Sequence, residues 1–270
     1  VSEFRDRGVI FVDDLDEVPA GATLLYSAHG VSPEIRRRAA ELQLRTVDAT
    51  CPLVTKVHRE VRRFSDQGFT VLLVGHAGHD EIVGTMGEAP HAIRLVENEE
   101  QAETVEVPDP QRVAYSTQTT LSVDDAERIV ARLRRRFPDL QGPARDDICY
   151  ATQNRQEAVR VLASETDLFL VVGSQNSSNS RRLAEIAAAA GIPAYLVDGP
   201  EDLHEAWFQA DQTVGITAGA SAPESLVQAC VEYLRQRFDA VVEERVLRVE
   251  SVHFTLPIEL RAPRETAPEA

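Results

Sequence analysis

Two cysteines occupy equivalent places in an internal repeat, and no other feature of the sequence restricts the fold as strongly. Cys51 and Cys149 each lie at a strand-to-helix turn, and each is followed by a helical pattern, an apolar strand and a glycine. The cysteine and that glycine are 24 residues apart in both copies, with the glycines at positions 75 and 173. The chain therefore contains a unit that recurs with a period of 98 residues.

Strands alternate with helices along the chain, which is the order expected of βαβ units and parallel sheets. Apolar runs predict strands over residues 9–12, 23–26, 71–74, 93–96, 112–115, 168–172, 194–197 and 213–216. Helices are predicted over residues 1–8, 53–66, 152–164 and 181–190, and after the N-cap residues Ser32, Ser122 and Ser221. The buried stripe of the helix over 53–66 is predicted to consist of Val54, Val57, Val61 and Phe64.

A strand, a polar turn and a capped helix follow one another three times, at His29, at Thr119-Thr120 and at Ser221. The first half of the repeated unit, which contains the cysteine, occurs only twice. We therefore predict an α/β protein of three similar lobes with small parallel sheets, the first lobe being incomplete. The expected boundaries are 1–50, 51–145 and 146–250, with a tail over 251–270 that is disordered beyond about residue 262. By the spacing of the other lobes, a further cysteine is expected roughly 40 residues before Val1.

The composition argues against several classes of protein. The net charge of -16 opposes non-specific binding to nucleic acid, which requires Lys and Arg to neutralise phosphates. No apolar run approaches the roughly 18 residues of a membrane span, and the start of the chain lacks a signal-peptide pattern. We expect a cytoplasmic protein with no membrane or nucleic-acid partner. The three cysteines indicate metal or catalytic use more than a disulfide framework.

The polar turns all follow strands, so in parallel sheets they lie at the carboxyl ends, where ligands bind. The helix N-termini that come next favour thiolates and phosphates. The pattern predicts a metal held by Cys51 and Cys149 beside an anion pocket. The alternative for these two residues is a pair of buried structural thiols. Cys230 has no repeat partner and is predicted to be a core residue.

The histidines and polar loops allow simpler interpretations too. The sequence His76-x-x-His79-x-Glu81 suits zinc by residue type, but its spacing matches no strong zinc pattern, and a loop around an anion explains it as well. His29 is compatible with a plain turn residue. His58 is predicted to lie on a solvated helix surface. The serines and asparagine over 177–179 are compatible with ordinary helix capping.

Six long motifs resemble those of one known family. They are DATCPLVTKVH, GHAGHDEIVGTMG, STQTTLSVDD, DDICYATQNRQEAVR, VVGSQNSSNS and GITAGASAPESLVQ. In this order, from residue 1 to about residue 262, they are similar to the IspH/LytB family of 4-hydroxy-3-methylbut-2-enyl diphosphate reductases. The resemblance implies three α/β lobes around a central 4Fe-4S iron–sulfur cluster. It implies the last step of the non-mevalonate isoprenoid pathway, with an allylic diphosphate as substrate and an electron donor such as ferredoxin or flavodoxin.

The resemblance also assigns roles to individual residues. It implies that the cluster ligands present in the chain are Cys51 and Cys149. It implies that Glu81 feeds protons toward the substrate oxygen and that Thr119 and Thr120 orient Glu81 and the hydroxyl end of the substrate. The substrate-binding residues that it implies are His29, His79, Ser177, Ser178, Asn179 and Ser221.

The family's first cluster cysteine and a further substrate-binding histidine have no counterpart in this sequence. A truncated form that assembles the cluster poorly is therefore expected. A competing hypothesis from another class is a cluster-free binding module for phosphorylated small molecules, which would use the same anion turns. A zinc hydrolase using His76, His79 and Glu81 is a third. Iron and sulfide analysis with a visible spectrum separates these hypotheses, because only the first predicts a brown protein.

Overall fold

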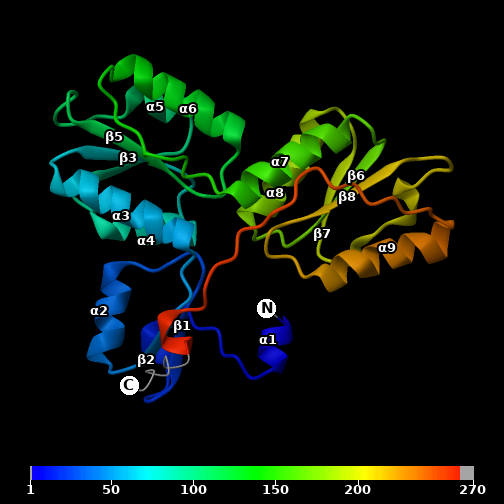
Figure 1. Cartoon of the computed structure of the whole chain (residues 1–270), viewed down its shortest axis with the longest axis horizontal. Helices are drawn as coiled ribbons and strands as arrows, with labels where there is room; N and C mark the ends of the chain where they lie inside the picture. Colours follow the sequence, from blue (N-terminus) through cyan, green and yellow to red (C-terminus); the bar gives the residue numbers. More distant parts are fainter. Residues whose placement is uncertain (1, 262–270) are drawn as a thin grey trace, which may run out of the picture. The chain divides into compact units, whose positions relative to one another are not determined.

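The computed structural model describes residues 2–261, and the strands in this part form three small parallel sheets (Figure 1). The first sheet pairs β1 with β2, the second has the order β4-β3-β5 and the third has the order β7-β6-β8. The strands are β1 Thr23–Tyr26, β2 Arg45–Asp48, β3 Thr70–Val74, β4 Ile93–Val96, β5 Val113–Thr117, β6 Leu168–Val172, β7 Ala194–Val197 and β8 Val214–Ala218. The prediction of an α/β fold with small parallel sheets in three groups is confirmed.

The helices include all of the predicted ones and two, Asp80–Glu88 and Glu99–Thr104, that were not predicted. They are α1 Ser2–Asp6, α2 Pro33–Glu41, α3 Pro52–Asp66, α4 Asp80–Glu88, α5 Glu99–Thr104, α6 Val123–Arg136, α7 Tyr150–Ala163, α8 Ser178–Ala189 and α9 Glu224–Phe238. Ser32 and Ser122 accept backbone N–H groups of the first turns of α2 and α6, as N-cap residues do. None of the helices in residues 2–261 is long and apolar enough to cross a membrane.

The chain divides into two compact units. Unit 1 consists of the described parts of Val1–Ser116, Arg134–Pro143 and Val252–Ala270, and unit 2 consists of Thr117–Leu133 and Ala144–Ser251. The lobe boundaries expected at 50, 145 and 250 stay a prediction. The expected disorder beyond residue 262 falls outside the described residues.

The core of unit 1 lies between α3, α4 and the central strand β3. The predicted apolar stripe of α3 is confirmed, since Val54, Val57, Val61 and Phe64 are all buried. Val61 and Phe64 belong to one cluster with Val71 and Leu73 of β3 and Ile82 of α4. Each such side chain contributes about 1.5–3 kcal/mol relative to an exposed position, so this cluster holds α3 and α4 together.

The core of unit 2 surrounds β6, which is buried along its whole length. Phe169 and Val171 pack into a cluster with residues of α7 and α8. Leu168, Leu170 and Val172 pack on the other face, in a cluster with Cys230 of α9. Helices cover both faces of the sheet, as expected of a parallel sheet with a continuous apolar central strand (Figure 1).

Two local predictions are wrong. Residues 9–12 form no strand, and Ile10 is 73% exposed. A short apolar run becomes a strand only where a neighbouring strand pairs with it through backbone hydrogen bonds. None of the described strands pairs with residues 9–12. The helix predicted to follow a capping box at Ser221 begins later, at Glu224, with Pro223 as an N-cap that supplies no side-chain hydrogen bond. Proline fixes the backbone before the helix, so Ser221 lies in the preceding turn.

Candidate functional site

The predicted site residues of unit 1 lie at the beginnings of three helices. Cys51 is the N-cap of α3, His79 is the N-cap of α4, and His29 lies in the turn just before α2. Each of the three turns follows the carboxyl end of a strand, namely β1, β2 or β3. Helix N-termini carry unpaired N–H groups and partial positive charge, so this arrangement favours anionic groups.

The turn that carries His29 depends on the glycine beside it. Gly30 has a φ of +76°, and its N–H donates to the carbonyl oxygen of Ser27 at 3.1 Å. A Cβ on Gly30 would meet His58 Cε1 and Thr50 Cγ2, both at 3.1 Å. Only glycine satisfies both the left-handed backbone and the tight space, so the position of His29 is fixed by its neighbour.

The two repeat cysteines make the same backbone contact in their separate units. The Cys51 N–H donates to the carbonyl oxygen of Ala28 at 3.0 Å, and the Cys149 N–H donates to that of Thr119 at 3.0 Å. In each unit the contact ties the cysteine to the polar turn of the neighbouring strand. The sequence repeat is therefore also a repeat of local geometry.

Both thiols lie partly open at helix N-termini. Cys51 and Cys149 are half-buried and form no disulfide, which argues against the hypothesis of two buried structural thiols. The Cys149 Sγ accepts the backbone N–H of Thr152 at 3.3 Å and lies 2.9 Å from its hydroxyl oxygen. Hydrogen-bond donation and the helix N-terminus both stabilise a thiolate.

Two histidines and a buried carboxyl come together at the start of α4. The rings of His29 and His79 have centroids 5.1 Å apart at an angle of 60°. His79 Nδ1 accepts the backbone N–H of Glu81 at 3.2 Å, and the Glu81 residue is only 1% exposed. His29 Nδ1 lies 3.5 Å from the exposed carboxylate of Asp80. The start of α4 in unit 1 thus offers imidazole groups and one buried acid.

The turn after β5 is anchored to the segment before Cys149 within unit 2. The Thr117 N–H donates to the buried Asp147 carboxylate at 2.9 Å. Thr119 is buried, and the Thr120 hydroxyl accepts the Gln118 side-chain amide at 2.8 Å. The geometry thus holds the two threonine side chains in a fixed turn beside the backbone of Cys149.

The first turn of α8 contains an unusual buried amide. Ser177 is the N-cap of α8, and its hydroxyl accepts the N–H of Ser180 at 3.2 Å and the Ser180 hydroxyl at 2.9 Å. Asn179 is 4% exposed, and neither its amide nitrogen nor its amide oxygen has a hydrogen-bond partner in the described part of the chain. A buried unsatisfied polar group costs about 1–3 kcal/mol, so this side chain is typical of a ligand site.

Two glycines at strand ends lie beside this turn, and neither was predicted to be part of a site. A Cβ on Gly173 or Gly219 would collide with the Ser180 hydroxyl. The Gly219 N–H donates to the carbonyl oxygen of Val172 at 2.9 Å, which joins the ends of β6 and β8. Both positions require a bare backbone close to the N-terminus of α8. The signal was present in the sequence as a glycine directly after each strand.

The predictions for Cys230 and His58 had different outcomes. Cys230 is fully buried in the core, and burial, with smaller effects of Glu201 and Asp202, raises the pKa of its thiol to about 11. Its prediction as a core residue is confirmed. His58 was predicted to be solvated, and this is wrong because it is 3% exposed. The turn around Gly30 covers the helix face on which His58 lies.

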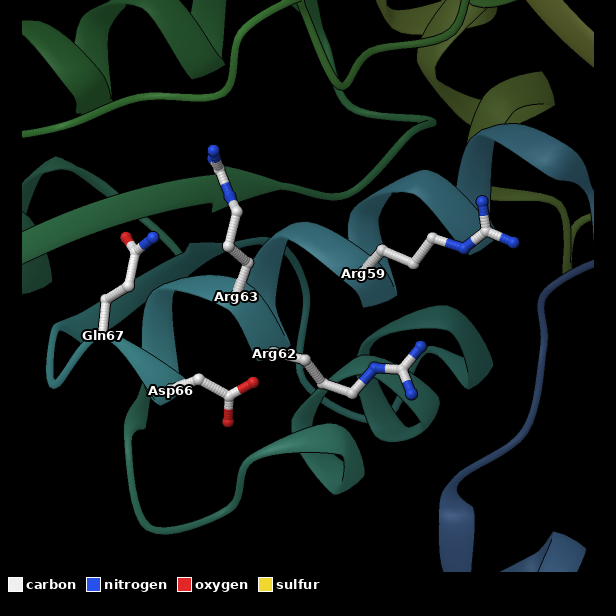
Figure 2. Close-up of a pocket in the computed structure, with 5 residues that line it drawn as sticks. All are labelled: Arg59, Arg62, Arg63, Asp66 and Gln67. Atoms are coloured by element: carbon white, nitrogen blue, oxygen red, sulfur yellow. The ribbon is translucent and has the colours of Figure 1, made fainter.

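Within residues 2–261, no three His, Cys, Asp or Glu side chains form a group that could hold a metal ion. The zinc hypothesis based on His76, His79 and Glu81 therefore has no geometric support. A shallow pocket of about 370 Å³ on the outer side of α3 contains none of the predicted site residues (Figure 2). Its lining consists of Arg59, Arg62, Arg63, Asp66 and Gln67.

Comparisons with known proteins agree with one another. The family model described as LytB protein matches residues 1–235. The 4-hydroxy-3-methylbut-2-enyl diphosphate reductase of Rhodopirellula baltica is 57% identical over 262 residues, which are 97% of this chain and 82% of that protein. The reductase of the same name from Azotobacter vinelandii is 54% identical, over 97% of this chain and 84% of that protein.

Two solved structures are also similar. The E-1-hydroxy-2-methyl-but-2-enyl-4-diphosphate reductase of Plasmodium falciparum has a TM-score of 0.92 and 36% identity, and the match covers 96% of this chain and 82% of that chain. A structure of (E)-4-hydroxy-3-methyl-but-2-enyl diphosphate reductase, described as the terminal enzyme of the non-mevalonate pathway, has a TM-score of 0.60 and 30% identity. That match covers 87% of this chain and 83% of that chain.

Proposed function

Because the chain belongs to the LytB protein family, we propose that it reduces (E)-4-hydroxy-3-methylbut-2-enyl diphosphate to isopentenyl and dimethylallyl diphosphate. This is the last step of the non-mevalonate isoprenoid pathway. The extensive match to reductases of this name carries the proposal. The turns at the helix N-termini support it, because each presents groups suited to an anionic, hydroxylated substrate.

The reaction removes the allylic hydroxyl group. The bond between the terminal carbon and its oxygen breaks, and the oxygen leaves as water after it takes up a proton. Two electrons and a second proton then reduce the remaining carbon chain to either isopentenyl or dimethylallyl diphosphate. The electrons come from an external donor, for which we propose a ferredoxin or a flavodoxin on the basis of the family resemblance.

The diphosphate is proposed to bind at the start of α8. The partial positive charge and free N–H groups of a helix N-terminus suit phosphate oxygens without a cluster of lysines. The unpartnered amide of Asn179 gives specific support, since its two amide protons would find acceptors there. The residues proposed to hold the diphosphate oxygens are Ser177, Ser178, Asn179 and Ser221.

The hydroxyl end of the substrate is proposed to meet the imidazole groups of His29 and His79. Glu81 is proposed to hold the proton for the leaving oxygen. Its carboxyl group is buried, which keeps competing water away, and its backbone N–H fixes the ring of His79. Thr119 and Thr120, held in their turn within unit 2, are proposed to orient Glu81 and the hydroxyl end.

The thiols of the N-cap residues Cys51 and Cys149 fit an iron–sulfur group as ligands. Neither forms a disulfide, both are partly open, and thiolates are the ligands that such clusters take. We propose that Cys51 and Cys149 are ligands of one 4Fe-4S cluster, an assignment that rests on the family resemblance and on the state of each thiol in its own unit. When bound, the cluster supplies one-electron redox chemistry and a Lewis-acidic iron.

A single anaerobic experiment tests the proposed function. Full-length protein, with any segment that precedes residue 1 included, is expected to turn brown on reconstitution with iron and sulfide and, with a chemical reductant, to convert the substrate to both products, measured by chromatography. A colourless protein that binds inorganic diphosphate without turnover would instead favour a cluster-free binding module. A protein that takes up neither iron nor diphosphate would contradict both hypotheses.

Replacing Asn179 by alanine tests the diphosphate site. Because the Asn179 amide has no hydrogen-bond partner among residues 2–261, we expect no loss of thermal stability in the substitution Asn179→Ala. Binding of inorganic diphosphate, measured by calorimetry, is expected to weaken by about 10- to 100-fold, since a hydrogen bond to a charged group is lost. The exposed neighbour Asn176 provides the control Asn176→Ala, which is expected to bind like the wild type. Equal affinity of both variants would remove Asn179 from the site.

A further inference from the structure

One buried carboxylate in unit 1 makes ion pairs with side chains from two other helices. Glu88 is the last residue of α4, and its side chain is 1% exposed. Its Oε1 atom lies 2.5 Å from Arg36 Nη2 of α2 and 3.0 Å from His58 Nδ1 of α3. Its Oε2 atom lies 3.3 Å from Arg62 Nε, also of α3, a residue that Figure 2 shows on the outer side of that helix.

The three helices that meet at Glu88 are the same three that begin at the proposed site residues. Helix α2 follows the turn of His29, α3 begins after Cys51, and α4 begins after His79. A contact between α2, α3 and α4 therefore sets the directions in which these helices run. It thereby also sets where their N-terminal ends lie within unit 1.

We infer that Glu88 is a positioning residue that fixes the positions of the turns of His29, Cys51 and His79 relative to one another. The functional importance of these relative positions rests on the function proposed above. Glu88 itself takes no part in the chemistry. It acts through the helices α2, α3 and α4, by way of Arg36 and His58.

Close packing brings α4 within reach of α2. A Cβ on Gly84 would lie 3.5 Å from the backbone of Gly30, and a Cβ on Gly87 would lie 2.5 Å from the Cβ of Ser32. These two glycines let α4 approach the His29 turn and the N-cap of α2 more closely than other residues would allow. Glu88 follows Gly87 directly, so its carboxylate lies beside Arg36.

The second helix of the network also touches the His29 turn. His58 Nδ1 lies 3.0 Å from the Glu88 carboxylate. The Cε1 atom of the same ring would lie 3.1 Å from a Cβ added at Gly30. His58 Nε2 is buried and has no hydrogen-bond partner in the described residues. The Glu88 carboxylate is thus the contact that fixes this imidazole beneath the turn.

The charges of the network favour an ionised Glu88. Burial is the largest single effect and raises the pKa of Glu88, but the hydrogen bonds from His58 and Arg36 together outweigh it and lower the pKa below its ordinary value of 4.5. A carboxyl group with a lowered pKa stabilises the folded state above its unfolded pKa. That contribution is lost as the pH falls from about 4.5 through the folded pKa.

Hydrogen exchange on the cluster-free protein tests the inference without any activity measurement. Three amides report on the three turns: Gly30, Cys51 and Glu81 each donate a hydrogen bond there. In the substitution Glu88→Gln, all three are expected to exchange about tenfold faster or more, because the turns open locally. The Cys149 amide, which makes the matching bond in unit 2, is expected to keep its wild-type rate.

Two further variants separate positioning from a general loss of stability. Arg36→Gln removes the contact from α2 alone and is expected to accelerate the Gly30 amide more than the Cys51 amide. Glu34→Gln removes a fully exposed ion pair with Arg37 on the same helix and is expected to change none of the three amides. A uniform acceleration across unit 1 in Glu88→Gln, or unchanged turn amides, would overturn the inference.

Kinetics on the reconstituted protein provide a second, independent readout. Displaced turns are expected to lower kcat/KM in Glu88→Gln by about 10- to 100-fold, because small misplacements of site groups have effects of this size. If the wild type has no turnover but the exchange pattern is selective, the proposed function fails and the positioning role stands. If the wild type turns over and Glu88→Gln has wild-type kinetics, the positioning role fails.

Discussion

Replacing Cys149 by serine is expected to abolish iron binding by the reconstituted protein and, with it, turnover. A serine hydroxyl is neither as soft nor as acidic as a thiol and is a poor ligand for iron–sulfur clusters. Changing only a supporting residue of a metal site costs about 10- to 100-fold in affinity, so loss of a direct ligand should cost about 100-fold or more. Iron and sulfide analysis and the visible spectrum measure the effect, independently of activity.

The third cysteine of the chain is the control for this substitution. Cys230 is buried in the core of unit 2 with a raised pKa, so Cys230→Ser should retain the wild-type iron content and spectrum while losing some thermal stability. Cys51→Ser should behave like Cys149→Ser, because the two residues are equivalent in the repeat. Wild-type iron content in Cys149→Ser would eliminate this residue as a ligand.

Replacing Glu81 by glutamine is expected to lower kcat by about 10²- to 10⁴-fold, which is the contribution of a positioned acid or base group. The glutamine has nearly the same shape, and the backbone N–H that binds His79 Nδ1 is unchanged. Binding of the substrate and assembly of the cluster should therefore persist. Steady-state kinetics, with the iron content measured on the same sample, separate loss of proton delivery from loss of the cluster.

A matched control exists at the start of α5. Glu100 is also an acid in the first turn of a helix of unit 1, but it is exposed and contacts none of the proposed site residues. Glu100→Gln should leave kcat and KM at their wild-type values. If Glu81→Gln retained a kcat close to that of Glu100→Gln, the proton for the leaving oxygen would have to come from another group.

The features predicted well are those that depend on local sequence. The stripe of Val54, Val57, Val61 and Phe64 has a helical period, and these residues are the buried face of α3. The apolar run of β6 was predicted with the same bounds as observed, because only a strand covered on both faces has such a composition. The equivalence of Cys51 and Cys149 could also be predicted, since a repeated sequence forms a repeated turn.

Two of the wrong predictions concern interactions with distant residues. Residues 9–12 have strand composition, but a strand also needs a neighbour, and sequence alone does not identify one. His58 was predicted to lie on a solvated helix surface, but it is buried. The partner that buries it, Glu88, is 30 residues away in the chain. The proline at position 223 competed with the capping signal of Ser221, and the fixed backbone of the proline prevailed.

By itself, the sequence determined most of the order of strands and helices, the repeat of cysteine turns and the family. These features follow from local periodicity and from motifs that are each contiguous in the chain. The tertiary structure alone decided which side chains lack hydrogen-bond partners within residues 2–261, as Asn179 does, and which belong to the network of Glu88. Hydrogen bonds and burial depend on distances between atoms, and residues far apart in sequence come within these distances only when the chain has folded.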